Sequence, residues 1–230
     1  MHQTHNLNQR MRLFISIFLP ILIYQLANFS ASFVDTTMTG QYDTLHLAGV
    51  SMATSLWIPF FDLLIGIVSA LVPIIGHHLG QGKKEKIASD FYQFIYLSLG
   101  LSLILFALVF VGAPLVLAHL GLEPLVEEVA KNYLWYLALG IIPLLLFSTI
   151  RSLFDALGLT KLSMYLMLLL LPLNGSFNYA LIYGAFGFPE MGGAGAGLGT
   201  SLAYWVLLLI SLLVAVKHCL LYTSDAADDL

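Results

Sequence analysis

The sequence predicts an all-α, polytopic membrane protein with about six transmembrane helices. Hydrophobic residues make up 59% of the chain and charged residues only 10%, and the mean hydropathy is +0.90. A soluble domain carries roughly a quarter charged residues and about half apolar ones. The apolar residues also gather in blocks that reach the roughly 20 residues a helix needs to cross a bilayer. Lipid is therefore the expected solvent.

Six apolar segments follow one another, each ended by glycine, proline or charge. Their expected limits are 13–39, 47–79, 91–118, 130–154, 163–185 and 194–217. The first continues without a small-residue cleavage site, so it is expected to be an uncleaved span. The second is long for one crossing and is expected to tilt or to extend past the headgroups. Pro20, Pro143 and Pro172 are the expected bend points.

The basic residues indicate the orientation. Eight of the nine Lys and Arg residues fall at alternate connections, namely Arg10, Arg12, Lys83, Lys84, Lys86, Arg151, Lys161 and Lys217. Only Lys131 falls on the other side, beside three glutamates. Positive charge marks the cytoplasmic face. The pattern predicts six spans with a cytoplasmic N-terminus, in the plasma (inner) membrane.

Several function classes lack their signatures. No basic patch with interleaved aromatics indicates nucleic-acid binding. The single cysteine, Cys219, excludes an internal disulfide, and no His/Cys spacing resembles a zinc site. There is no nucleophile–base pair, P-loop or dinucleotide fingerprint, so neither an enzyme nor a bound cofactor is expected.

One face of the first span is polar. Spacings of three and four place Gln25, Asn28, Ser32, Asp35 and Thr39 on one stripe. An Asp at the bilayer centre costs about 2.5–3.5 kcal/mol on insertion scales, and such residues are functional-site candidates. The alternative is that Asp35 lies at the outer headgroup level, capped by water.

The fifth span carries two carboxamides on one face. Asn174 and Asn178 are four residues apart, and Pro172 just before them removes a backbone donor. With Asp35, these oxygens would suit Na⁺, or a protonatable carboxyl in a hydrogen-bonded cage. The alternative is that the asparagines only join helices by hydrogen bonds.

Three further features involve residues in or near the expected spans. Asp62, with Ser55 and Ser69 seven residues to either side, is expected to be a second buried carboxylate, either lining the same cavity or bonding a neighbouring helix. Arg151 and Asp155 are expected to pair near the inner surface. The GxxxG spacings at Gly76–Gly80 and Gly195–Gly199 permit close helix contact but are common by chance.

Six stretches together resemble the multidrug and toxic compound extrusion (MATE) transporters. The segments 172–184 (PLNGSFNYALIYG) and 188–200 (FPEMGGAGAGLGT) resemble that family's fifth-to-sixth helix signature. The stretches DTTMTG at 35–40, LAGV at 47–50, GQGKK at 80–84 and RSLFDALGLTK at 151–161 are similar to its other connections. The matches keep the family's order and cover nearly all of residues 10–217.

The resemblance implies one lobe of a two-lobed antiporter that exports organic cations or drugs in exchange for H⁺ or Na⁺. It implies that Asp35 is the cation-coupling carboxylate and that Asn174, Asn178 and Thr200 complete the cation site. Gln25, Asn28, Ser32 and Asp62 are the candidates for the substrate cavity. Family members are about twice this length, so a second, C-terminal lobe is the expected partner, and the single lobe is expected to be inactive alone.

Two other functions remain as alternatives. A lipid-linked precursor flippase would place several cationic side chains in its cavity, whereas no Lys or Arg is expected deep in a span here. A membrane scaffold subunit would use its polar groups only to join helices. The sequence further divides into a lobe, 1–219, and an acidic tail, 220–230, which is either a short solvated end or read-through sequence foreign to the fold.

Overall fold

The computed structural model describes residues 7–228, and the side chains of these except Lys84 and 218–228. All regular elements in this range are helical. They are α1 (Leu7–Tyr42), α2 (Thr44–Ser69), α3 (Leu71–Gly80), α4 (Lys84–Ala107), a π-helical turn (Leu108–Gly112), α5 (Ala113–His119), α6 (Pro124–Ala138), α7 (Ile141–Ala156), α8 (Thr160–Ile182), a 3₁₀ turn (Ala185–Gly187) and α9 (Gly193–Asp228).

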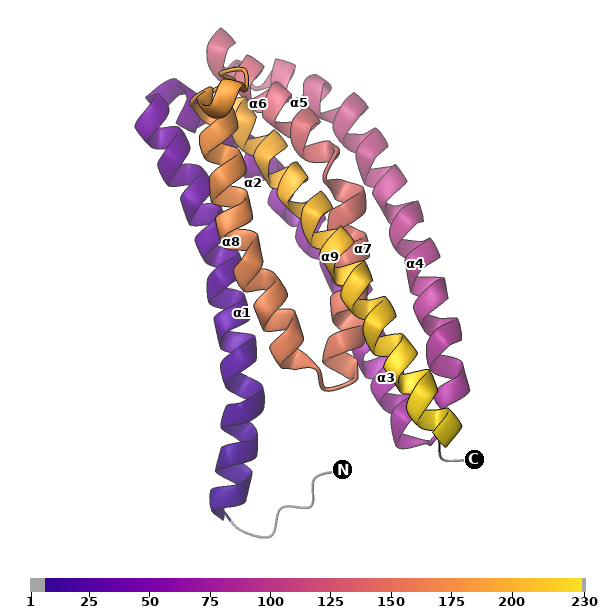
Figure 1. Cartoon of the computed structure of the whole chain (residues 1–230). Coiled ribbons are helices and arrows are strands. Elements are labelled where there is room, and N and C mark those ends of the chain that lie inside the picture. Colours follow the sequence, from indigo (N-terminus) through magenta and orange to yellow (C-terminus); the bar gives the residue numbers. More distant parts are fainter. Residues whose placement is uncertain (1–6, 229–230) are drawn as a thin grey trace.

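The helices form up to six membrane crossings, as the sequence predicts. Five helical stretches are long and apolar enough to span alone, namely Leu7–Tyr42, Thr44–Gly80, Glu85–His119, Thr160–Ile182 and Gly193–Lys217. The sixth crossing is the pair α6 and α7, which meet at an angle of 49°. Successive connections lie at opposite ends of the bundle, and α1 begins at the end where α9 finishes (Figure 1).

The bend between α6 and α7 is not centred on a proline. Pro20 and Pro172 lie inside the single helices α1 and α8, and the bend between α6 and α7 comes just before Pro143. There, α9 satisfies the carbonyls that the break releases. Ser201 Oγ donates to Tyr136 O at 2.6 Å, and Trp205 Nε1 donates to Leu139 O at 3.1 Å.

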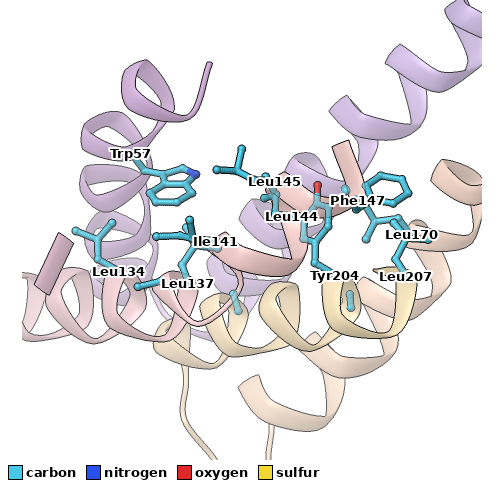
Figure 2. Packing of buried hydrophobic residues seen from close by; sticks show 14 of the residues in the cluster. Trp57, Leu134, Leu137, Ile141, Leu144, Leu145, Phe147, Leu170, Tyr204 and Leu207 are labelled. Atoms are coloured by element: carbon cyan, nitrogen blue, oxygen red, sulfur yellow. The ribbon is translucent and has the colours of Figure 1, made fainter. Parts of the chain in front are cut away.

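The hydrophobic core lies between α2, α6, α7, α8 and α9. Its labelled side chains fall into two groups, one around Trp57 and Ile141 and one around Phe147, Leu170 and Tyr204 (Figure 2). By contrast α1 lies at one side of the bundle (Figure 1), with large exposed side chains such as Phe29 and Phe33. Its outer surface is therefore suited to lipid or to further protein.

The two GxxxG spacings have opposite environments. A Cβ atom on Gly195 would lie 2.7 Å from the carbonyl oxygen of Leu181 in α8, and one on Gly199 would collide with the side chain of Asn178. A Cβ on Gly76 or Gly80 would meet nothing within 4 Å. Only the second glycine pair brings two helix backbones together, and that contact places Thr200 against the asparagines of α8.

The connection from α8 to α9 holds the C-terminal end of α1 by hydrogen bonds. Tyr42 Oη donates to Glu190 Oε1 at 2.8 Å, and Tyr183 Oη donates to Met38 O at 2.8 Å. The Gly193 amide donates to His46 Nδ1 at 3.0 Å at the start of α2. These contacts fix the position of α1 along its own axis relative to α8 and α9, and they therefore fix the position of Asp35.

The expected tail begins inside α9. The backbone continues as a helix to Asp228, so the change in composition at residue 220 does not end the helix. Residues 229–230 lie outside the described residues.

Candidate functional site

Asp35 of α1 meets polar side chains of α8 and α9. Asn178 Nδ2 donates a hydrogen bond to Asp35 Oδ1, and Thr200 Oγ1 donates to Asp35 Oδ2 at 3.2 Å. Asn174 Nδ2 donates to Thr200 Oγ1 at 2.9 Å, and Asn178 Nδ2 also donates to Asn174 Oδ1 at 3.2 Å. The four residues form one closed network from three helices, which we call the Asp35 network.

The carboxylate in this network is buried and has no cationic partner. Asp35 is 9% exposed and Asn178 0%. Among the described side chains the ion pairs are His78–Asp90 and Arg151–Asp155, and neither involves Asp35. Hydrogen bonds to both oxygens favour the ionised form, but a buried charge without a counter-charge is costly. A proton or a small cation would remove that cost.

Asp35 is surrounded by protein. The carboxylate lies seven residues before Tyr42, about 10 Å down the helix axis. Thr39, one turn nearer the C-terminal end of α1, is fully buried, and its hydroxyl has no hydrogen-bond partner. The amide oxygen of Asn178 is likewise buried and unpartnered. Two oxygen atoms without hydrogen-bond partners therefore lie at the network, Asn178 Oδ1 within it and Thr39 Oγ1 one helical turn further along α1.

A cavity of about 540 Å³ lies beside the network, toward the N-terminal end of α1. We call it the inner cavity. Of the four predicted cavity residues, Gln25, Asn28 and Asp62 line it. Ser32 does not, and its side chain is exposed elsewhere on α1. The predicted stripe on α1 is therefore divided, with Gln25 and Asn28 in the cavity and Asp35 and Thr39 in the helix packing.

The expected burial of Asp62 is wrong. Its side chain is exposed, because it faces the inner cavity and does not pack against a neighbouring helix. Ser69, one of its two predicted companions, also lines the inner cavity, whereas Ser55 is exposed and bonds only to the Ser51 carbonyl at 2.8 Å. Because a carboxylate facing lipid is costly, this face is suited to water or to protein.

Arg151 also lines the inner cavity. Its Nη1 donates to Asp155 Oδ2 at 2.8 Å, which confirms the predicted pair. Its guanidinium carbon lies 4.6 Å from the centre of the Tyr24 ring of α1. No Lys or Arg was expected deep in a span, and Arg151 reaches the cavity from the last turns of α7. Tyr24 was not predicted, although it precedes Gln25 on the same helix.

The chain has counterparts among known proteins. A family model, MatE, matches residues 20–180. A protein of Streptococcus pneumoniae, described as a probable multidrug resistance protein NorM, is 72% identical over 218 residues, which cover 95% of this chain and 48% of that protein. A Bacillus subtilis protein of the same description is 37% identical over 218 residues, with the same two coverages. The chain spans about half the length of the curated relatives it matches.

Solved structures agree in fold. A crystal structure of MATE in the straight conformation superposes with a TM-score of 0.81 at 16% identity, over 94% of this chain and 47% of that chain. An outward-facing multidrug resistance MATE family transporter of the MOP superfamily gives 0.74 at 20% identity, over 84% and 42%. The family match covers well over half of the chain, and so the chain belongs to the MATE family.

Proposed function

We propose that residues 1–219 are the first lobe of a cation-coupled antiporter that exports organic cations or drugs across the plasma membrane. Its relatives of twice the length are described as probable multidrug resistance proteins. The observation that carries the proposal is a buried carboxylate, Asp35, that no cationic side chain neutralises among the described residues. A second lobe would complete the substrate path, and residues 220–230 would lie outside the lobe.

Asp35 would couple the two fluxes through its charge. The ionised carboxylate recruits Asn178 and Thr200, which hold α1 against α8 and α9. A bound proton or Na⁺ neutralises it and weakens those hydrogen bonds, so that α1 can shift. Substrate and cation then compete because they favour different positions of α1, and one gradient can drive the other flux.

The amide of Asn178 bears on the coupling ion. It presents nitrogen, a donor, to Asp35, and such a donor suits an ionised carboxylate that awaits a proton. A Na⁺ ion requires oxygen ligands, so the amide would have to turn by half a rotation to offer Oδ1. The geometry supports H⁺ better than Na⁺ as the coupling ion.

Transport can be tested with a two-lobed chimera. Residues 1–219 are joined to the second half of the Streptococcus pneumoniae relative and expressed in a host that lacks its own exporters. In inverted vesicles with an imposed pH gradient and no Na⁺, we expect ethidium uptake that collapses when the gradient is dissipated. Uptake that follows only a Na⁺ gradient would reverse the choice of ion, and no gradient-driven uptake of any dye or drug would contradict export.

Thr200→Val is expected to weaken cation coupling without unfolding the lobe. Valine keeps the volume of threonine but removes the hydroxyl that accepts from Asn174 and donates to Asp35. A hydrogen bond to a charged group contributes about 1.5–3 kcal/mol. The proton concentration that gives half-maximal uptake should therefore shift by roughly tenfold or more. Thr36→Val is the matched control, since that exposed hydroxyl bonds only to Ser32 O.

The proposed orientation predicts which residues a membrane-impermeant thiol reagent can reach. With Cys219 replaced by serine, we expect Glu190→Cys to react in intact cells, because it lies in the connection between α8 and α9. Lys161→Cys, at the start of α8, should react only after the cells are permeabilised. The opposite pattern would place the N-terminus outside.

The flippase alternative has less support. The inner cavity contains one arginine, Arg151, and Asp155 neutralises it. A site for anionic lipid headgroups would need an excess of cationic side chains. A scaffold subunit would not need a buried carboxylate without a counter-charge, such as Asp35, because that group only costs stability.

A further inference from the structure

The connection between α8 and α9 lies against the turn from α1 to α2, at the same end of the bundle (Figure 1). Gly192 in this connection has a left-handed backbone, with a φ of 57°. A Cβ atom on Gly192 would lie 2.6 Å from His46 Cε1 and 2.8 Å from Tyr42 Cε1. The backbone of the connection is therefore in direct contact with the imidazole of His46.

His46 is unprotonated at Nδ1 when it binds the connection. The Gly193 amide donates to His46 Nδ1 at 3.0 Å, and because an amide N–H can only donate, this nitrogen carries a lone pair. Gly193 is the first residue of α9, and the first amides of a helix have no acceptor within it. Protonation of Nδ1 would set two donors against each other, beside the positive end of the α9 dipole.

The charged form of this imidazole has other partners nearby. The titratable groups around it are Tyr42 of α1, Asp43 before α2, Tyr183 of α8 and Glu190 of the connection. α9 adds the Gly193 amide, and α6 adds an apolar contact, Val129 against Gly49. The imidazolium form would leave that amide for the carboxylate of Asp43 or Glu190. Histidine changes its charge between about pH 5 and 8, so the charge selects between two sets of partners.

The contact lies at one end of a route to Asp35. A Cβ atom on Gly193 would lie 3.1 Å from Thr39 Cγ2 and 3.1 Å from the His46 carbonyl oxygen, so Gly193 contacts both residues. Thr39 is fully buried, and its hydroxyl has no hydrogen-bond partner. Asp35 lies one helical turn further along α1. A hydroxyl both donates and accepts, so Thr39 is suited to pass a proton between entering water and the carboxylate.

We propose that His46 closes this end of the Asp35 network when it is neutral and opens it when it is protonated, so that the coupling proton enters past Gly193 and Thr39. His46 is a positioning residue, because it acts through Gly193 and is not a member of the network. In the proposed orientation this end faces the outside, from which the coupling proton enters during export. As a proton route the inference rests on the proposed function, whereas the pH-dependent contact itself does not.

The first test follows hydrogen exchange of single amides in the purified two-lobed chimera, at about pH 8 and about pH 5.5. In His46→Gln the side-chain oxygen can still accept from Gly193 but does not titrate. At the lower pH we expect the Gly193 amide to exchange roughly tenfold faster in the parent than in His46→Gln, and at the higher pH equally. Comparison at one pH removes the intrinsic pH dependence of exchange. The Met191 amide, which donates to Leu181 O at 2.9 Å, is the internal control.

His46→Ala has no acceptor, so it should expose the Gly193 amide at both pH values. A merely structural role of His46 would not produce this pattern, in which the parent switches, glutamine stays protected and alanine stays exposed. Equal protection of Gly193 in the parent and His46→Gln at the lower pH would overturn the proposal, as would a pH response that persists in His46→Ala.

The second test measures entry toward Asp35. Thr39→Cys is made with Cys219→Ser, and its reaction with a membrane-impermeant thiol reagent is followed in the chimera. At about pH 5.5 we expect it to react roughly tenfold faster with His46 present than with His46→Gln. Gln41→Cys, exposed at the same end of α1, should react equally in both. Equal rates for Thr39→Cys in both would contradict entry at this end.

Asp35→Asn separates this inference from the export function. It should keep the pH response of the Gly193 amide even though it stops transport, because His46 contacts Gly193 and not Asp35. Loss of the response in Asp35→Asn would show that Asp35 carries it and would contradict this inference alone. A chimera that shows the response without gradient-driven uptake would contradict export and leave the contact between His46 and Gly193 as a pH-dependent one.

Discussion

Asp35→Asn is expected to abolish gradient-driven dye uptake while the protein still inserts into the membrane and folds. Asparagine matches aspartate in shape and can still accept a hydrogen bond from Thr200. Its amide, however, neither ionises nor binds a proton at physiological pH. The network therefore loses the change of charge that would move α1. Uptake by inverted vesicles that contain the two-lobed chimera should fall to that of vesicles without a transporter.

Asp43→Asn is the matched control for that experiment. Asp43 lies eight residues further along the chain, where its carboxylate caps the first turn of α2 by accepting from the amides of Leu45 at 2.7 Å and His46 at 3.2 Å. Asparagine is an equally good helix cap, so uptake should be retained. Parental uptake in Asp35→Asn, with the protein present at the same level, would remove Asp35 from the coupling mechanism.

The number and order of the membrane spans could be predicted because they depend on local sequence alone. Apolar blocks of sufficient length and basic residues at alternate connections are properties of single segments. The bend between α6 and α7 could not be placed in this way. The carbonyls of Tyr136 and Leu139 are satisfied by Ser201 and Trp205, which lie more than sixty residues further along the chain.

The candidate site was predictable to the extent that helix periodicity defines faces. The spacing of Asn174 and Asn178 predicted their shared face, and their hydrogen bond agrees with it. Thr200 could be added only through the family resemblance, because its place opposite α8 depends on packing between helices. The exposure of Asp62 and the inward turn of Arg151 also depend on which neighbour covers each helix face, and the sequence of one helix does not state that.

Gly195→Ala is expected to destabilise the lobe, whereas Gly76→Ala should leave it unchanged or more stable. The new methyl group at Gly195 would lie 2.7 Å from the Leu181 carbonyl oxygen and 3.0 Å from the Ile182 nitrogen. Both are backbone atoms of α8 and cannot rotate away, so α8 and α9 must separate. Overpacking of this kind costs about 1–3 kcal/mol, which should lower the midpoint of thermal unfolding by several degrees.

Gly76 has the same GxxxG spacing, but its substitution by alanine is expected to have the opposite effect on stability. Nothing lies within 4 Å of the position its Cβ would take, so the methyl group meets no obstacle in α3. Alanine in a helix is favoured over glycine by roughly 0.5–1 kcal/mol. Thermal unfolding of the purified chimera, followed by loss of monodisperse protein, measures both variants side by side. Equal effects at the two glycines would mean that α8 and α9 are not in backbone contact, and Thr200 would then lose the support that brings it to Asp35.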